Sequence, residues 1–185
     1  TVRSDAMVQL AWTRRTMSED GYTLQDLGIA ALTTSGQMTP VQRELTPLKL
    51  SEGGYWGLDV AERNGEVVVA GYHRDISTGG SWLDVTSIFT MISERPDLSG
   101  SWDGPFIVHS DVEVLASQGD PVSVSISEER LHILFQTERD DITGVERLGV
   151  LYSHGERDQE GWNFIAPVGD NASDHHLSVD EDGQL

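Results

Sequence analysis

The sequence predicts an all-β protein built from repeated sheets. Apolar runs are short and separated by turn-forming residues, and no window keeps apolar residues at i, i+3, i+4 and i+7 for three helical turns. A sequence motif of strand, tight turn and strand, called here the repeated phrase, recurs about every 55–65 residues. The length of 185 residues suits one domain with a substantial core. We therefore predict a single β-propeller-like domain over residues 1–185, with about three four-stranded blades.

The repeated phrase is clearest around the dipeptide Asn64-Gly65. Residues 58–63 alternate apolar and polar side chains, the dipeptide forms a turn, and an apolar strand begins at Val67. Residues 122–135 repeat this plan, and residues 177–185 begin it again. Equivalent positions are Val8, Val67, Leu131 and Leu185, which give approximate blades at 8–66, 67–130 and 131–185.

The strands within each period follow from the apolar runs between turn signals. The first period has a hairpin tip at residues 18–21, and the third has a charged loop at residues 137–143. Strands are expected at residues 8–12 and 28–33, at 67–73 and 85–92, and at 131–136 and 147–153.

Three blades are fewer than the ~4–8 that close a propeller ring. The sequence also opens in the middle of the repeated phrase, at Thr1. We expect either a piece of a larger protein or a homodimer that closes the ring. In a dimer, residues 2–8 of one copy would complete the sheet begun by residues 177–185 of the other.

Composition limits the partners. Acidic residues outnumber basic ones by 31 to 12, for a formal net charge of −19, which disfavours nucleic acid and anionic membranes. Such acidity is typical of proteins from salty environments, and also of acidic proteomes in general. Cysteine is absent, which removes disulfides, thiol nucleophiles and cysteine-ligated zinc. No apolar run approaches the ~18 residues that span a bilayer.

A second repeated element follows a later strand of two periods. Residues 93–102 and 153–162 both contain Ser, Asp, Gly and Trp in that order, ending at Trp102 and Trp162. This order resembles a loosened Asp-box, the Ser-x-Asp-x-Gly-x-x-Trp hairpin of sialidases and related propellers. The resemblance implies a structural hairpin on the rim, away from the active centre. The Phe/Tyr-Arg-Ile-Pro motif of sialidases is absent from this sequence.

Candidate site residues stand before the innermost strand of each period, because ligands of propellers bind where loops converge on the central channel. Asp174, His175 and His176 precede Leu177, and this acid and histidine pair could supply a general base. We assign them as candidate catalytic residues. A merely solvated histidine pair is the alternative.

The matching positions in the other periods are candidate substrate-binding residues. Tyr55 and Trp56 precede Leu58, and Asp120 precedes the second phrase; aromatic faces and acids suit sugar recognition. His73 and Arg74 end a strand and could face the channel, although Asp75 could simply neutralise Arg74.

No metal site or cofactor is predicted. The acids of residues 180–183 could hold a calcium ion, because Ca²⁺ prefers several oxygen ligands, but the other ligands of a calcium loop are missing. A plain hairpin tip is the favoured interpretation.

Two functions remain open from the sequence. The first is a carbohydrate-active enzyme, a glycoside hydrolase or polysaccharide lyase acting on an extracellular glycan, as the sialidase-like resemblance implies. The second is a non-catalytic module that binds a glycan or a protein. Both place the protein outside the cell or at its surface, and the enzyme is favoured only by analogy of fold.

Overall fold

The computed structural model describes residues 7–17, 23–33, 53–75, 86–94, 101–113, 122–128, 130–137, 139–140, 149–170 and 175–178. Among these residues no helix is long and apolar enough to cross a membrane. The strands are β1 (Met7–Met17), β2 (Thr23–Thr33), β3 (Gly53–Arg63), β4 (Glu66–Asp75), β5 (Thr86–Ser93), β6 (Trp102–Glu113), β7 (Ser123–Ile126), β8 (Leu131–Thr137), β9 (Arg139–Asp140), β10 (Gly149–Gly155) and β11 (Phe164–Asp170).

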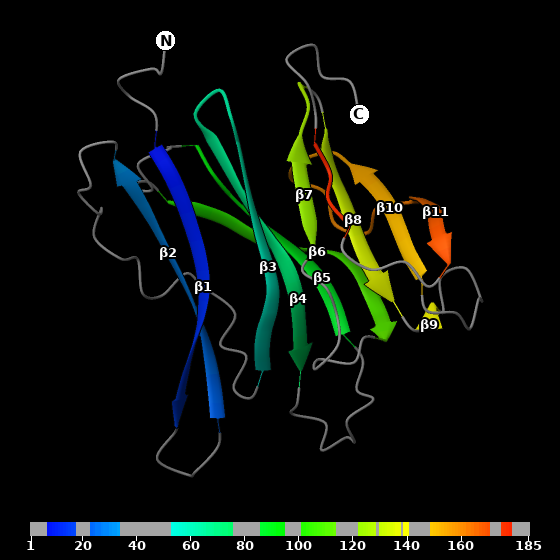
Figure 1. Cartoon of the computed structure of the whole chain (residues 1–185), viewed down its shortest axis with the longest axis horizontal. Helices are drawn as coiled ribbons and strands as arrows, with labels where there is room; N and C mark the ends of the chain where they lie inside the picture. The colour runs from blue at the N-terminus through cyan, green and yellow to red at the C-terminus, as the bar shows by residue number, and fades with distance from the viewer. Residues whose placement is uncertain are drawn as a thin grey trace.

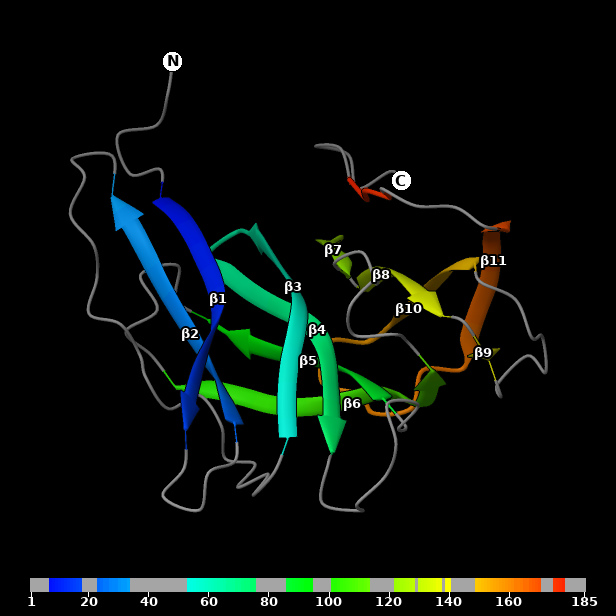
Figure 2. The same cartoon turned by 60° about the horizontal axis from the view of Figure 1, so that its bottom comes forward.

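These strands form three antiparallel sheets that follow one another in chain order (Figure 1). Sheet one is the β1-β2 pair, sheet two has the order β3-β4-β5-β6-β9, and sheet three has the order β7-β8-β10-β11. Consecutive strands that pair as neighbours are typical of a propeller blade. Figure 2 shows the three sheets side by side, with sheet two between the others. The fold is therefore all-β and propeller-like.

The turn predicted at Asn64-Gly65 is confirmed. Asn64 has a φ of 55° and Gly65 a φ of 90°, and Arg63 pairs with Glu66 across the two-residue loop. A two-residue loop with positive φ at both positions matches the twist of the strands that it joins. The backbone N–H of Gly65 donates to Glu62 Oε1 at 2.8 Å.

Because this hairpin lies within sheet two, β3 and β4 belong to one blade. The second phrase likewise places β7 and β8 together in sheet three. The approximate boundaries at 66/67 and 130/131 were counted between equivalent residues, and each falls inside a hairpin. Sheet one is described as two strands, so four-stranded meanders are seen in sheets two and three.

Two apolar cores lie on opposite faces of sheet two, because alternate residues of a strand point to opposite faces. On one face Val67, Val69, Phe89 and Met91 pack with Ala11 of sheet one. The other face packs against sheet three. That larger core contains Val68, Ala70, Tyr72, Ile88, Ile92, Val108, Val112, Val122, Val124, Ile126, Leu131, Ile133, Phe135, Leu151 and Trp162.

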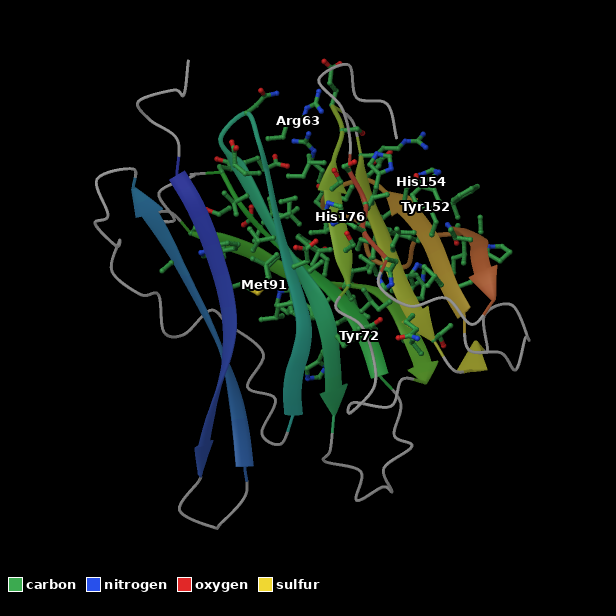
Figure 3. All side chains as sticks on the ribbon, viewed as in Figure 1. Arg63, Tyr72, Met91, Tyr152, His154 and His176 are labelled. Carbon is green, nitrogen blue, oxygen red and sulfur yellow. The ribbon has the colours of Figure 1, made fainter. Side chains whose placement is uncertain are left out.

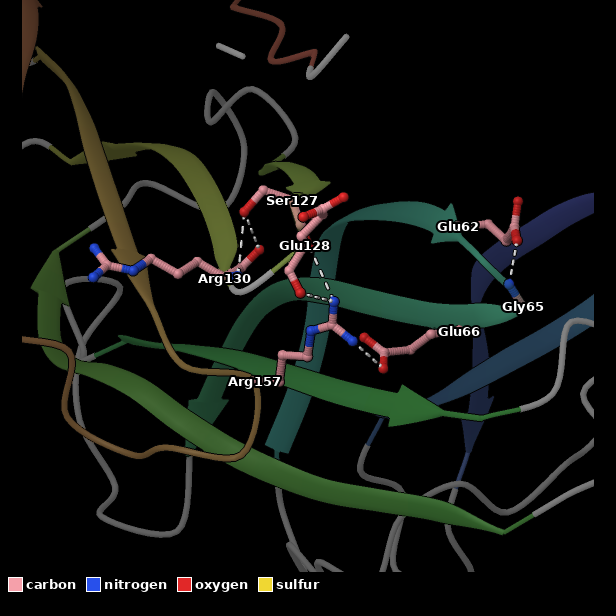
Figure 4. Close-up of polar contacts among 7 residues, drawn as sticks. All are labelled: Glu62, Gly65, Glu66, Ser127, Glu128, Arg130 and Arg157. Carbon is pink, nitrogen blue, oxygen red and sulfur yellow. Dashed lines mark hydrogen bonds and ion pairs between the residues drawn. The ribbon is translucent and has the colours of Figure 1, made fainter. Parts of the chain in front are cut away.

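Polar contacts cross the seam between sheets two and three at two places. Within the core, the Tyr72 hydroxyl donates to the Gln136 carbonyl at 3.1 Å and accepts the Gln136 backbone N–H at 2.8 Å. Near the hairpin ends, Arg157 forms an ion pair with Glu66 at 2.5 Å and donates to the Ser127 and Glu128 carbonyls, each at 3.0 Å (Figure 4). A buried polar group needs such partners, so these bonds restrict how the two sheets can slide.

The connection between β10 and β11 anchors sheet three on β6. The backbone N–H groups of Gly161 and Trp162 donate to the carbonyls of Ile107 and Val108, each at 3.1 Å. Trp162 is buried, and its indole N–H donates to the Gln159 carbonyl at 3.0 Å. The tryptophan of the β10-β11 connection thus packs between two sheets.

Replacing Gly155 by alanine should destabilise this seam. A Cβ at position 155 would lie 2.5 Å from three atoms of the Trp162 ring, which is buried in the core. We expect a loss of about 1–3 kcal/mol in the free energy of unfolding, as for other overpacked cores. Urea denaturation measures this loss. Gly161→Asn is the control, because position 161 has open space and a φ of +67°, which asparagine tolerates. Equal stability of both variants and the original chain would contradict this account of the seam.

Candidate functional site

The beginnings of the innermost strands are joined by hydrogen bonds from one sheet to the next. Gly57 adopts a φ of 57° at a bulge in β3, and its carbonyl accepts the backbone N–H of Val122 at 2.9 Å. Asp59 bridges the same two strands: its Oδ1 accepts the Val60 N–H and its Oδ2 accepts the Val124 N–H, each at 2.8 Å. The carboxylate therefore fixes β7 beside β3.

The next link, one sheet farther on, also joins a side-chain oxygen to a backbone N–H. Ser123 occupies the position of the repeat that Asp59 holds in sheet two. Its hydroxyl accepts the backbone N–H of Leu177 at 2.8 Å, so residues 175–178 lie alongside β7. Figure 3 labels His176 near this strand. Gly57 and Leu177 directly follow predicted site segments, and Val122 lies two residues after Asp120. Hydrogen bonds thus connect these three positions in one row.

The predicted catalytic residues are described in part. His175 is half-buried, and both of its ring nitrogens are shielded from solvent. His176 is exposed. Asp174 lies outside the described residues, and so does the predicted binding residue Asp120. Their roles remain predictions.

The other predicted binding residues lie at one end of sheet two. Tyr55 pairs with His73 in the β3-β4 register, and Gly54 pairs with Arg74. Trp56 pairs with Tyr72 directly before the bulge at Gly57. His73 is buried, with 5% of its surface exposed. The structure describes only the backbone of Tyr55, Trp56 and Arg74.

Among the described residues no group of three or more His, Asp or Glu side chains could hold a metal ion. The suggested calcium loop at residues 180–183 lies outside the described part of the chain.

A cluster of ring side chains on sheet three escaped the sequence analysis. His132 of β8 lies against Tyr152 and His154 of β10, and His154 stacks on Phe164 of β11 with ring centroids 4.4 Å apart. We call these four residues the histidine–aromatic cluster. Arg130 donates to His154 Nδ1 at 3.1 Å. Figure 3 shows Tyr152 and His154 together on β10.

The hydrogen bonds of the cluster suit a neutral His132. Its Nδ1 lies 2.7 Å from the Tyr152 hydroxyl, and its Nε2 lies 2.9 Å from Ser127 Oγ. The Ser127 hydroxyl donates to the Arg130 carbonyl, so its oxygen is free to accept from an Nε2–H, and Tyr152 then donates to Nδ1. A neutral imidazole makes one donation and one acceptance, and these two hydroxyls can satisfy both.

Electrostatics act in the same direction. Burial, and then the nearby charges of His154 and Arg130, lower the pKa of His132 from its ordinary 6.5 to about 4. Burial and Arg130 also lower the pKa of His154. Burial raises the pKa of Tyr152, although Arg130 opposes this rise. The cluster is therefore uncharged at neutral pH apart from the guanidinium.

Only one sequence signal pointed to this cluster. His132 and His154 occupy positions of apolar strands that hold Val68 and Ile92 in sheet two. The contact between them depends on the register with which β8 pairs with β10. The sequence of the connection between these strands does not determine that register.

Removal of the Asp59 carboxylate should loosen the link between β3 and β7. Asp59→Ala leaves the N–H of the buried Val124 without its acceptor, which costs about 1–3 kcal/mol in the free energy of unfolding. Asp59→Asn keeps one side-chain oxygen and should lose less. Urea denaturation of both variants measures the difference. If Asp59→Ala unfolds at the same urea concentration as the original chain, the bridge has no stabilising role.

His132 should make stability depend on pH. Its folded pKa of about 4 lies below the unfolded 6.5, so the unfolded state takes up the proton first as the pH falls. The contribution of His132 to the free energy of unfolding is fully present above pH 6.5 and is lost as the pH falls to 4. The loss is at most about 3 kcal/mol. His132→Gln should flatten that part of the profile, whereas titration of the carboxylates continues in both proteins. Parallel profiles from denaturant unfolding at each pH would contradict the assignment.

No protein-family model and no curated protein matches this sequence. Solved structures that it resembles include an alpha-L-arabinofuranosidase from Fusarium graminearum in complex with an iminosugar inhibitor, at 10% identity and a TM-score of 0.49. Another is an alpha-L-arabinanase from Penicillium chrysogenum complexed with arabinobiose, at 11% identity and a TM-score of 0.49. Each alignment covers 95% of this chain and 46% of the other, so this chain spans about half the length of those proteins.

Proposed function

We propose that this chain forms part of a carbohydrate-active propeller, a glycoside hydrolase or polysaccharide lyase that acts on an extracellular glycan. The supporting observation is the row of hydrogen bonds through Gly57, Val122, Ser123 and Leu177, which brings the beginnings of the inner strands together. Residues directly before these strands then border one mouth, where a propeller can bind a ligand.

The proposed chemistry is proton transfer by the histidine pair. His176 is exposed and can meet a ligand, while His175 is half-buried beside it. A neutral imidazole accepts a proton from water in hydrolysis, or from a sugar carbon in lyase chemistry. Asp174 would orient the imidazole. Arg74 and Asp120 would supply charged contacts, and Tyr55 and Trp56 would supply ring surfaces for a sugar. His73 is buried and would support Tyr55, its partner in the β3-β4 register, without meeting the sugar.

The Asp-box-like hairpin has a structural part in this proposal. The sialidase-like resemblance rests on residues 93–102 and 153–162, and the second of these segments packs Trp162 into the seam. Its hairpin therefore holds the sheets that carry the site and takes no part in catalysis.

A non-catalytic glycan-binding module is the second candidate. The register that sets Tyr55 beside His73 and Trp56 beside Tyr72 places two ring residues in succession at one end of sheet two. Neighbouring aromatic residues suit sugar binding without any proton transfer.

The double variant His175→Ala/His176→Ala separates the two candidates. Turnover would be measured on a panel of polysaccharides that includes arabinan, uronic-acid polymers and sialylated glycans, and binding by calorimetry. We expect turnover to fall by at least about 100-fold, the contribution of a general base, while binding and circular dichroism are retained. Glu160→Ala, an exposed change in the β10-β11 connection, is the control.

Unchanged turnover in the double variant would remove the histidines from the mechanism. Binding without turnover in the original chain, lost on Trp56→Ala or Tyr55→Ala, would establish the binding module instead. If no polysaccharide in the panel is bound or cleaved, the proposal of a carbohydrate-active protein fails.

A further inference from the structure

Equivalent residues of the repeat lie on the same face of their sheets, so the repeat indicates which face of each sheet packs against the preceding sheet. In sheet two, Val67 and Val69 belong to the core that contacts sheet one, whereas Val68, Ala70 and Tyr72 belong to the core that contacts sheet three. We call the side of a sheet that contacts the sheet before it in the chain its preceding face, and the other side its following face.

Sheet three and sheet one obey the same rule. Leu131 and Ile133, equivalent to Val67 and Val69, pack in the core shared with sheet two and so lie on the preceding face. Ala11 in sheet one is equivalent to Ala70, and it packs against sheet two as a following-face residue should. The equivalence of Val8, Val67 and Leu131 therefore predicts facing correctly in all three sheets.

The rule places the histidine–aromatic cluster on the following face of sheet three. His132 is equivalent to Val68, and His154 and Phe164 lie beside it across the sheet. In sheet two the matching Val68 and Ile92 are covered by sheet three. On this face of sheet three, Phe164 keeps 45% of its surface exposed. Val168, at the bulge of β11, keeps 60%. These two are the exposed large hydrophobic residues among those described.

The described residues 175–178 lie at the inner edge of this face. The Leu177 N–H donates to Ser123 Oγ on β7. In the repeat, Leu177 is equivalent to Val122, the residue directly before β7. Residues 175–178 thus stand where the innermost strand of a following sheet belongs. The exposure lies at the opposite edge, on β11.

Sheet one carries the complementary sequence. Val8, Leu10 and Trp12 hold alternate positions of β1 and are equivalent to Val67, Val69 and Gly71 in sheet two and to Leu131, Ile133 and Phe135 in sheet three. In sheets two and three the apolar members of this set pack on the sheet before. The same set in sheet one is therefore suited to pack against the following face of another sheet.

We propose that the following face of sheet three binds sheet one of a second copy of this chain. In this contact, as between sheets two and three, the following face of one sheet packs against the preceding face of the next. Residues 175–178 lie at its inner edge. It is head to tail, and two such contacts related by a twofold axis join two copies with three sheets each into a closed ring. A ring of six sheets lies within the range of known propellers, ~4–8.

Solution mass tests the proposal, measured by light scattering at low and at high salt. The high-salt arm screens the repulsion expected from a net charge of −19 on each copy. We expect a discrete species of twice 20.3 kDa. A monomer at both salt concentrations would overturn the proposal, and so would an open series of larger species.

Substitution on either side of the contact should then abolish the dimer. Phe164→Glu changes an exposed position of the following face, and Trp12→Glu changes the other side. Each should give a monomer with an unchanged circular dichroism spectrum. Asn163→Glu is the matched control, because this exposed neighbour of Phe164 precedes the strand and should leave the dimer intact.

Mixing the two kinds of variant gives the sharpest result. A dimer of one Phe164→Glu chain with one Trp12→Glu chain keeps one unmodified contact, because both changes fall in the other contact. We expect the mixture to regain dimers that neither variant forms alone. Failure of the mixture to dimerise, or a dimer that is unaffected by Phe164→Glu, would overturn the head-to-tail contact.

Discussion

The structure depends on how each inner strand is held by the one before it. Asp59 and Ser123 are equivalent in the repeat, and each offers a side-chain oxygen to a backbone N–H of the next inner segment. Apolar packing alone leaves two sheets free to slide, since it has no direction. A hydrogen bond of 2.8 Å removes that freedom, and it does so at the edge where the candidate site residues lie.

Away from the inner strands, other polar contacts also hold sheet two against sheet three. Tyr72 spans the interior and satisfies both backbone groups of Gln136, while Arg157 joins Glu66 to the β7-β8 turn. The first contact is buried and costly to break. The second is partly exposed, and salt will weaken it. Together with the inner links they fix sheets two and three as one unit, which gives the histidines of residues 175–178 a rigid neighbour.

The sequence predicted what local patterns encode. The Asn64-Gly65 turn and the long repeat arise from residues close in the chain, so the strands and the all-β class could be recognised. The histidine–aromatic cluster could not, because His132 meets Tyr152 only through the β8-β10 register. The facing of the sheets was equally hidden, as it needs the packing of Ala11 and Ala70 to give the repeat a direction. Tyr55, Trp56, Asp120 and Asp174 stay predictions for the site.

The short strand β9 links the sheets in another way. Arg139 and Asp140, which follow β8 of sheet three, pair with Glu113 and Val112 at the end of β6 in sheet two. An open edge strand is a template for association with other chains, and a short antiparallel segment there blocks part of it. The same pairing joins the outer strand of sheet two, β6, to the segment that follows β8 of sheet three. Strand exchange of this kind opposes peeling of sheet three from sheet two, so the two sheets should resist mechanical separation at their outer edge as well as at the inner strands.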